Sequence, residues 1–238
     1  MLRAMMNHYG KTLSHISTSP FNDWVQARLD DIYMPPNVQL MKQDKRSFMK
    51  TGSQITEYRN VFLTDGKLSR HTFIKGEAGS GKSTFLAKSV MDWCSANKTK
   101  SVEEVPTAQL KSADRDSRVQ LTQFFKDIST PKSFNFIFHV TLRDSVRQFE
   151  ILEMIKQQII DTIYRKDDRE NAYKLLNEIM KRERCLILLD GLDEWTGTGS
   201  HCLPALAASF SLCDILITTR PWKITQKCPT QKLTRCCN

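Results

Sequence analysis

The sequence GEAGSGKS occupies residues 76–83 and runs directly into Thr84-Phe85-Leu86. It fits the pattern G-x-x-x-x-G-K-[ST], in which a glycine-rich loop joins a strand to a helix. The short apolar run Thr72-Phe73-Ile74 precedes the pattern, and apolar residues recur at helical spacing from Phe85 to Trp93. We therefore expect a strand, a tight loop and a helix in this order, with the rest of the fold arranged around them.

A loop of this kind can bind phosphate groups through its backbone. Its glycines allow backbone angles that residues with a β-carbon resist, so successive N–H groups can turn towards an anion. The helix that begins near Lys82 adds the positive end of its dipole. Lys82 would reach the β- and γ-phosphates of a nucleotide, and the Ser83 hydroxyl would ligate Mg²⁺. The candidate phosphate-binding residues are Gly76, Glu77, Ala78, Gly79, Ser80, Gly81, Lys82, Ser83 and Thr84.

Length and composition indicate an ordinary globular protein. A chain of 238 residues is long enough for one sizeable α/β domain with an appendage. The hydrophobic content of 40% and the charged content of 26% are typical of soluble proteins. No apolar run approaches the roughly 18 residues of a membrane span, and the N-terminus lacks the apolar core of a signal peptide. We expect a cytoplasmic protein without a membrane span.

The charge and the cysteines suggest no further site. The net charge is +9, with basic residues concentrated between Lys42 and Lys50, but no nucleic-acid-binding module accompanies them. We therefore interpret these residues as a solvated face and expect no nucleic-acid partner. The seven cysteines include no C-x-x-C pair, which argues against a zinc site. Cys185 and Cys213 lie in or beside apolar runs, where a reduced thiol behaves as a small core residue.

The first part of the chain is expected to be mainly helical. Between Phe21 and Ile32 apolar residues repeat at helical spacing, and Pro35-Pro36 would end this N-terminal helical segment. The following residues are polar and basic, with one more possible helix over residues 55–62 before the turn at Asp65-Gly66. We take residues 1–65 as this segment and its lead-in, residues 66–222 as a nucleotide-binding domain, and residues 223–238 as an irregular tail.

Beyond a mostly polar excursion over residues 95–132, strands and helices alternate. We expect strands at 134–142, 185–189 and 214–219, and helices at 149–163, 172–179 and 203–210. The run Cys185-Leu186-Ile187-Leu188-Leu189 is continuously apolar, as in a central parallel strand covered on both faces. This alternation predicts a three-layer α/β/α fold with a mostly parallel sheet and right-handed crossovers.

Acidic residues follow the second of these strands, and an arginine follows the third. Asp190 emerges at the carboxyl end of an apolar strand, where open α/β sheets bind ligands, and would hold Mg²⁺. Glu194 is the preferred residue to orient or deprotonate an attacking water, and Asp193 is the alternative. Arg220 would stabilise charge on the γ-phosphate. Arg143 could also contact phosphate, although we favour a surface ion pair.

The segments GEAGSGKST, LILLDGLDEW and LITTRPW together resemble the NACHT subclass of signal-transduction P-loop ATPases, the nucleotide switch of NOD-like immune receptors. The resemblance extends over residues 31–222 and includes FIFHVTLRDS between the phosphate motifs. It implies ATP/ADP exchange, slow hydrolysis and nucleotide-gated self-association. Ile32-Tyr33-Met34-Pro35-Pro36 resembles the approach to the domain, near which family members contact adenine, so the resemblance places Tyr33 near the base.

The sequence departs from this family after the third motif. Only 238 − 221 = 17 residues follow Pro221, so we expect a form truncated after the third-motif strand, and a fifth strand within Gln231–Cys236 is doubtful because this stretch is polar. An alternative is an interaction or regulatory fragment with a vestigial nucleotide site, which associates with longer relatives. A phosphotransferase acting on a small molecule is a weaker interpretation because no acceptor-binding lid is visible.

Overall fold

The computed structural model describes residues 1–17, 26–44, 47–64, 67–68, 71–98, 124–196, 202–224 and 234–237. A seven-stranded sheet dominates the fold. Its strands, in spatial order, are β4 (Ser47–Ile55), β3 (Val38–Asp44), β11 (Thr234–Cys237), β7 (His71–Gly76), β10 (Cys213–Thr219), β9 (Cys185–Asp190) and β8 (Phe136–Thr141). The five strands from β11 to β8 run parallel, whereas β3 and β4 are antiparallel to their neighbours. The predicted α/β fold with a mostly parallel sheet is confirmed.

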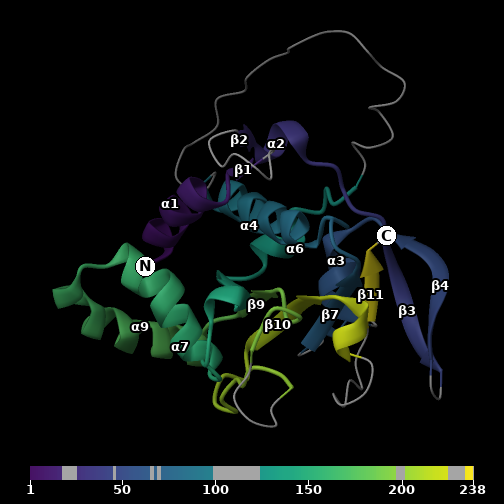
Figure 1. The fold of residues 1–238 in the computed structure, drawn as a ribbon. Helices are drawn as coiled ribbons and strands as arrows, with labels where there is room; N and C mark the ends of the chain where they lie inside the picture. Colours follow the sequence, from purple (N-terminus) through teal and green to yellow (C-terminus); the bar gives the residue numbers. More distant parts are fainter. Residues whose placement is uncertain are drawn as a thin grey trace, which may run out of the picture.

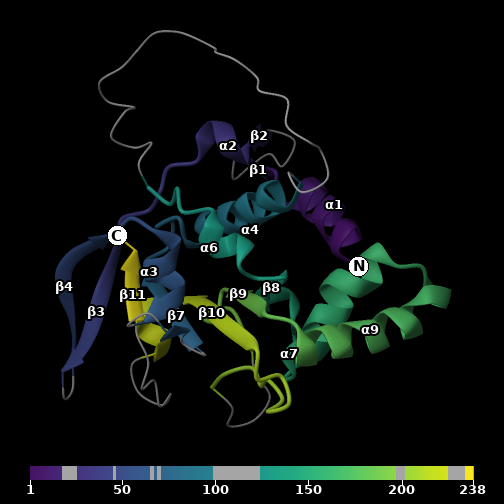
Figure 2. The same cartoon turned by 180° about the vertical axis from the view of Figure 1, so that it is seen from behind.

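Helices flank this sheet (Figures 1 and 2). The main helical elements are α1 (Leu2–Thr12), α2 (Leu29–Ile32), α3 (Tyr58–Phe62), α4 (Lys82–Lys98), α6 (Ser129–Lys132), α7 (Ile151–Ile155), the π-helical turn η3 (Lys156–Ile160), α8 (Asp161–Ile163) and α9 (Arg169–Arg182). Short 3₁₀ turns are η2 (Leu142–Asp144), η4 (Lys166–Asp168) and η5 (Pro221–Ile224), and two small antiparallel pairs join β1 (His15–Ser17) to β2 (Gln26–Arg28) and β5 (Leu63–Thr64) to β6 (Lys67–Leu68). Among the described helices, none is both long and apolar enough to cross a membrane.

The helix after the glycine-rich loop is held tightly against the sheet. Phe85, Leu86, Val90 and Trp93 of α4 are fully buried, as their helical spacing predicted. The indole Nε1 of Trp93 donates a hydrogen bond of 2.9 Å to the Phe134 carbonyl, just before β8. Burial of one such side chain stabilises the fold by about 1.5–3 kcal/mol. The start of α4, which carries Lys82, is therefore fixed relative to the sheet.

Side chains close the outer edge of β8. The Tyr9 hydroxyl of α1 donates to the Ile137 carbonyl at 2.9 Å and accepts the His139 N–H at 3.1 Å. Further along the strand, the Gln158 side chain of η3 accepts the Thr141 N–H and donates to the Thr141 carbonyl, both at 2.9 Å. An unpaired strand edge is a template for association, and these bonds remove it along β8. The N-terminal helix thus belongs to the same packed unit as the sheet.

The fifth parallel strand that the sequence left doubtful is present as β11. Thr234–Cys237 pairs in parallel with β7 on one side and antiparallel with β3 on the other. Polar residues did not prevent the strand, because its backbone groups bond to neighbours on both sides. The β7 strand is consequently an interior strand.

Three sequence predictions are corrected. A single helix through residue 32 is wrong, because β2 pairs with β1 and leaves only the four-residue α2 before Tyr33; residues 18–25 lie outside the described part. The hairpin β3–β4 occupies most of the polar and basic stretch after Pro36, for which no strand was expected, and α3 covers the end of the helix expected over residues 55–62. The turn expected at Asp65-Gly66 lies outside the described residues.

The helix predicted over residues 203–210 is also wrong. Ala205 instead forms an isolated bridge with Glu150: its N–H donates to the Phe149 carbonyl and its carbonyl accepts the Ile151 N–H, both at 2.9 Å. These long-range bonds take the backbone groups that a helix would use. Of the polar excursion over 95–132, residues 95–98 continue α4, residues 129–132 form α6, and residues 99–123 lie outside the described part.

The edge closure of β8 gives the first prediction. Tyr9→Phe should lower the free energy of unfolding by about 1–3 kcal/mol, because two buried backbone groups lose their partner. Urea unfolding measures the change. Tyr164→Phe is the matched control, since the Tyr164 hydroxyl has no hydrogen-bond partner among the described residues. Equal stability of the two variants would contradict the role of Tyr9.

Candidate functional site

The loop between β7 and α4 has the backbone shape that its glycines predicted. Gly79 and Gly81 have φ angles of +77° and +83°, a region that L-residues with a β-carbon rarely adopt. The first helical hydrogen bond runs from the Phe85 N–H to the Gly81 carbonyl at 2.8 Å, so α4 begins at the loop. A β-carbon on Gly81 would lie 3.7 Å from Cβ of Pro36, which brings the segment after Tyr33 against the loop.

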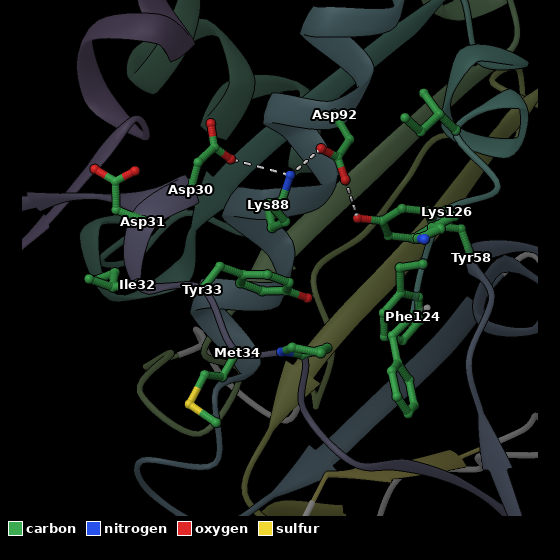
Figure 3. A pocket seen from close by; sticks show the side chains of 13 residues that line it. Asp30, Asp31, Ile32, Tyr33, Met34, Tyr58, Lys88, Asp92, Phe124 and Lys126 are labelled. Carbon is green, nitrogen blue, oxygen red and sulfur yellow. Dashed lines mark hydrogen bonds and ion pairs between the residues drawn. The ribbon is translucent and has the colours of Figure 1, made fainter. Parts of the chain in front are cut away.

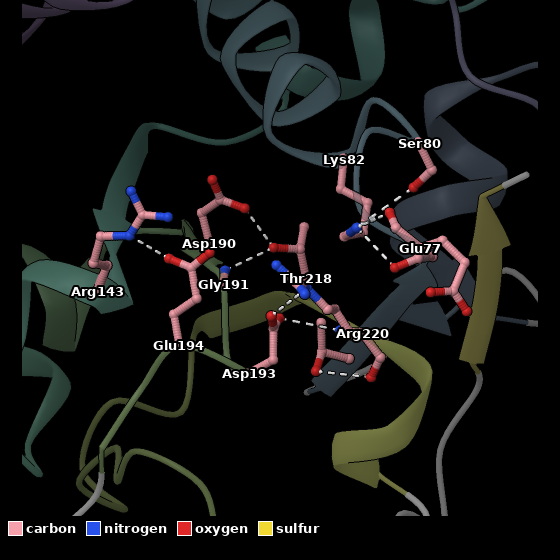
Figure 4. Close-up of polar contacts among 12 residues, drawn as sticks. Glu77, Ser80, Lys82, Arg143, Asp190, Gly191, Asp193, Glu194, Thr218 and Arg220 are labelled. Carbon is pink, nitrogen blue, oxygen red and sulfur yellow. Dashed lines mark hydrogen bonds and ion pairs between the residues drawn. The ribbon is translucent and has the colours of Figure 1, made fainter. Parts of the chain in front are cut away.

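Lys82 lies over this loop. Its ammonium donates to the carbonyls of Gly76 at 2.8 Å and Glu77 at 2.7 Å, and lies 3.4 Å from the Ser80 hydroxyl (Figure 4). Glu77, Ala78 and Gly79 are exposed. The loop therefore brings glycines with positive φ angles, the start of a helix and a positive charge together at one accessible place. Phosphate recognition requires this combination.

The acidic turn after β9 is hydrogen-bonded to the end of β10. The Thr218 hydroxyl donates to Asp190 Oδ1 at 2.5 Å and accepts the Gly191 N–H at 2.9 Å. The Thr218 carbonyl accepts the Leu192 N–H at 2.9 Å. Gly191 has a φ of +83°, which lets the chain turn here. Leu192 and Trp195 are almost fully buried and anchor the turn in the core.

Asp193 forms an ion pair and a backbone hydrogen bond with Arg220. Asp193 Oδ2 lies 2.9 Å from Arg220 Nε, and Asp193 Oδ1 accepts the Arg220 N–H at 3.1 Å. The Asp193 side chain is only 6% exposed, whereas that of Arg220 is 42% exposed. The carboxylate thus fixes the backbone and the guanidinium of the arginine together (Figure 4).

Glu194 forms an ion pair with Arg143, which follows β8 in η2. The Arg143 guanidinium donates to Glu194 Oε2 and holds the pKa of this carboxyl below its usual value, against a smaller opposing effect of burial. Arg220 and Lys82 lower the pKa of Glu194 further, so the glutamate lies within electrostatic reach of the glycine-rich loop. The surface ion pair favoured for Arg143 is present.

Two residues of the site could hold a divalent cation. Ser83 is exposed and lies in the first turn of α4, which follows β7. Asp190 ends β9, and β10 lies between β9 and β7 in the sheet. Within the described ranges, no three His, Cys, Asp or Glu side chains are grouped to hold a metal ion by themselves. One carboxylate and one hydroxyl nonetheless fit Mg²⁺, because this ion prefers oxygen ligands and commonly takes few of them from the protein.

Tyr33 lies apart from these groups, in a pocket of about 1160 Å³ beside α4 (Figure 3). No residue of the glycine-rich loop lines this pocket. Its lining combines aromatic and apolar residues with charged ones. The lining residues include Asp30, Tyr33, Met34, Tyr58, Lys88, Asp92, Phe124 and Phe125.

A polar chain crosses this pocket. Lys88 lies between Asp92, to which it donates a hydrogen bond, and Asp30 at 3.3 Å, and the Tyr58 hydroxyl donates to Asp92 at 2.7 Å. The Lys88 ammonium also lies 5.9 Å from the centre of the Tyr33 ring. This network was not expected from the sequence, where its signal was the spacing of Lys88 and Asp92, four residues apart on a helix.

The predicted site residues therefore fall into two groups. The loop residues 76–84 lie at the start of α4, while Asp190, Asp193, Glu194 and Arg220 are joined by the turn after β9 and the end of β10. Thr218 was quoted within LITTRPW but received no role, although it bonds to Asp190, Gly191 and Leu192 of the acidic turn. The signal was a pair of threonines directly after the apolar run Ile215–Ile217 of this strand.

The pair Arg143–Glu194 predicts a pH dependence. Because the folded-state pKa of Glu194 lies below its usual value of 4.5, the pair stabilises the fold above about that pH, and the effect disappears as the pH falls through the folded-state pKa. Arg143 is 71% exposed, so Arg143→Met should cost at most about 1 kcal/mol at neutral pH, and less in high salt.

Urea unfolding of wild type and Arg143→Met across the acidic range tests this expectation. The difference in unfolding free energy should vanish at low pH, and Arg3→Met, at an exposed position of α1, should show no such trend. A difference that is constant with pH would contradict the ion pair.

Among curated proteins, no significant match was found. The family model described as "Nephrocystin 3, N-terminal" matches residues 50–220, well over half of the chain, and this range contains the glycine-rich loop, the acidic turn and Arg220. The chain belongs to the Nephrocystin 3, N-terminal family.

Proposed function

We propose that this chain is a NACHT-type signalling ATPase module that binds ATP or ADP with Mg²⁺ and hydrolyses ATP slowly. The observation that carries the proposal is the loop at the start of α4, where Gly79 and Gly81 have positive φ angles and the Lys82 ammonium lies on the loop carbonyls. Backbone N–H groups, a helix start and a lysine at one accessible place form a phosphate-binding site.

The proposed roles follow the geometry. Lys82 would exchange its carbonyl partners for the β- and γ-phosphates, and Ser83 and Asp190 would hold Mg²⁺, which supplies charge neutralisation at the phosphates. Arg220, partly exposed and held by Asp193, would face the γ-phosphate. Pro36 lies against Gly81 three residues after Tyr33, while Tyr33 itself lines a pocket that no loop residue lines. The resemblance is the reason to propose that Tyr33 contacts the base. The choice of adenine rests on the family resemblance.

Glu194 is the better candidate to orient water. Asp193 is 6% exposed and already bound by two groups of Arg220, whereas the Glu194 side chain is 32% exposed. The lowered pKa of Glu194 makes its carboxylate a weak base, since an efficient base has a pKa near the operating pH. Slow hydrolysis is the expected consequence, in keeping with a switch rather than a metabolic enzyme.

The pairing of both acids also favours a second candidate. If neither carboxylate leaves its arginine, the chain would bind nucleotide without hydrolysis, or act as an interaction module whose nucleotide site is vestigial. The first proposal also includes nucleotide-gated self-association, with further copies of this chain or with longer relatives, in signalling of the innate-immune type. This part of the proposal rests on the resemblance to the NACHT subclass.

Loss of the loop lysine tests nucleotide binding. Lys82→Ala should weaken Mg-ADP and Mg-ATP binding by about 1.5–3 kcal/mol, because a charge-assisted contact is lost. Thermal unfolding is the measurement, since a ligand at a hundred times its dissociation constant adds about 2.7 kcal/mol of stability. Lys132→Ala, on the exposed end of α6, is the control and should respond as wild type does. A folded wild type that shows no nucleotide shift would favour the vestigial site.

Turnover tests the acids. Glu194→Gln should retain nucleotide binding and lower the rate of phosphate release by about 10²-fold or more, the range typical of a general base. Asp193→Asn should disturb Arg220 first and therefore weaken ATP binding more than ADP binding. If Asp193→Asn alone abolishes turnover while binding is retained, the roles of the two acids are reversed.

A further inference from the structure

Thr218 sits between the two strands that carry the proposed site, and its hydroxyl has a fixed direction. β10 lies between β7, which ends in the glycine-rich loop, and β9, which ends in Asp190. The Thr218 side chain is fully buried. Because the Gly191 N–H is itself a donor, the hydroxyl oxygen accepts it at 2.9 Å, and the single hydroxyl proton is directed at Asp190 Oδ1 at 2.5 Å.

We infer that Thr218 is the positioning residue that orients the Asp190 carboxylate for a divalent cation. One carboxylate oxygen is held by the threonine, which fixes the rotation of the group and directs the other oxygen. The same residue accepts the Leu192 N–H at 2.9 Å through its carbonyl, so the turn and the carboxylate move with β10. Partners that orient a metal ligand in this way commonly determine metal affinity.

This inference rests on the proposed function, and it makes a claim that the proposed function does not contain. Nucleotide binding at the glycine-rich loop depends on backbone N–H groups and Lys82, none of which bonds to Thr218 among the described contacts. Thr218 should therefore act on the Mg²⁺-dependent part of nucleotide affinity and leave the Mg²⁺-independent part unchanged.

Three variants distinguish a role of Thr218 in orienting Asp190 from a role in core packing. Thr218→Val keeps the shape but loses the hydroxyl, and Thr218→Ser keeps the hydroxyl. Thr219→Val is the matched control: Thr219 is equally buried and adjacent, but successive side chains of a strand point to opposite faces, and its hydroxyl lies 3.3 Å from the Arg220 carbonyl rather than on Asp190.

The measurement is the affinity for N-methylanthraniloyl-ADP, followed by fluorescence, in chelator and across a Mg²⁺ titration. Thr218→Val should raise the Mg²⁺ concentration for half-maximal effect by about 10- to 100-fold, while the affinity in chelator stays unchanged. Thr218→Ser and Thr219→Val should both behave as wild type. Circular dichroism checks the fold of each variant. If Thr218→Val does not fold, Thr218→Cys replaces it, because a thiol fills the space but is a weak donor.

The outcomes distinguish the two claims. A folded Thr218→Val with wild-type Mg²⁺ dependence overturns the positioning role while nucleotide binding stands. An equal loss of affinity with and without Mg²⁺ also overturns it, because the residue would then be merely structural. If wild type binds the probe in neither condition while remaining folded, the proposed function itself fails, and the positioning role fails with it.

Discussion

The candidate site depends on one physical constraint, the attachment of the acidic turn after β9 to the end of β10. The Thr218 hydroxyl bonds to Asp190 and Gly191, and Asp193 holds both the backbone and the guanidinium of Arg220. Buried polar groups need such partners, because an unpaired one costs about 1–3 kcal/mol. The constraint therefore places an acidic group and a basic group at the carboxyl ends of neighbouring strands, where α/β sheets bind ligands.

The sheet makes this attachment possible. The parallel pairing of β10 with β9 aligns Ile217 with Leu189, so the next residues along both strands, Thr218 and Asp190, meet at the sheet end. Most side chains of β9 and β10 are buried, and a slip by one residue would move each of them to the opposite face and disrupt this close packing. Tyr9 and Gln158 close the outer edge at β8, and β11 covers β7 on the other side. The central strands are thus held from both directions.

The sequence predicted those features whose cause is local. The glycines of GEAGSGKS predicted the loop because the backbone angles that it needs are a property of glycine, and the run CLILL predicted β9 because a central strand is apolar throughout. Features with distant causes were missed. Ala205 bonds to Phe149 and Ile151, more than fifty positions earlier, so its apolar neighbours suggested a helix that the structure lacks. The hairpin β3–β4 was missed because its polar content hides a strand pattern.

The candidate site shows the same difference between features with local causes and features with distant causes. The residue types and their order were readable from the sequence, but which arginine pairs with which acid was not, because that depends on the register of three strands. Thr218 and Thr219 are adjacent and identical in type, and only the alternation of side chains along β10 decides which one meets Asp190.

The arrangement also separates binding from hydrolysis under the proposed function. Phosphate recognition would use backbone groups of the exposed loop and Lys82, whose ammonium would exchange the Gly76 and Glu77 carbonyls for phosphate. Hydrolysis would need a carboxylate, and each candidate already neutralises an arginine: Asp193 with Arg220, and Glu194 with Arg143. The Arg143 pair is the weaker constraint, because Arg143 is 71% exposed and solvent screens its charge. Release of Glu194 is therefore the easier step, and it links any turnover to the position of η2 after β8 rather than to the loop that holds the nucleotide.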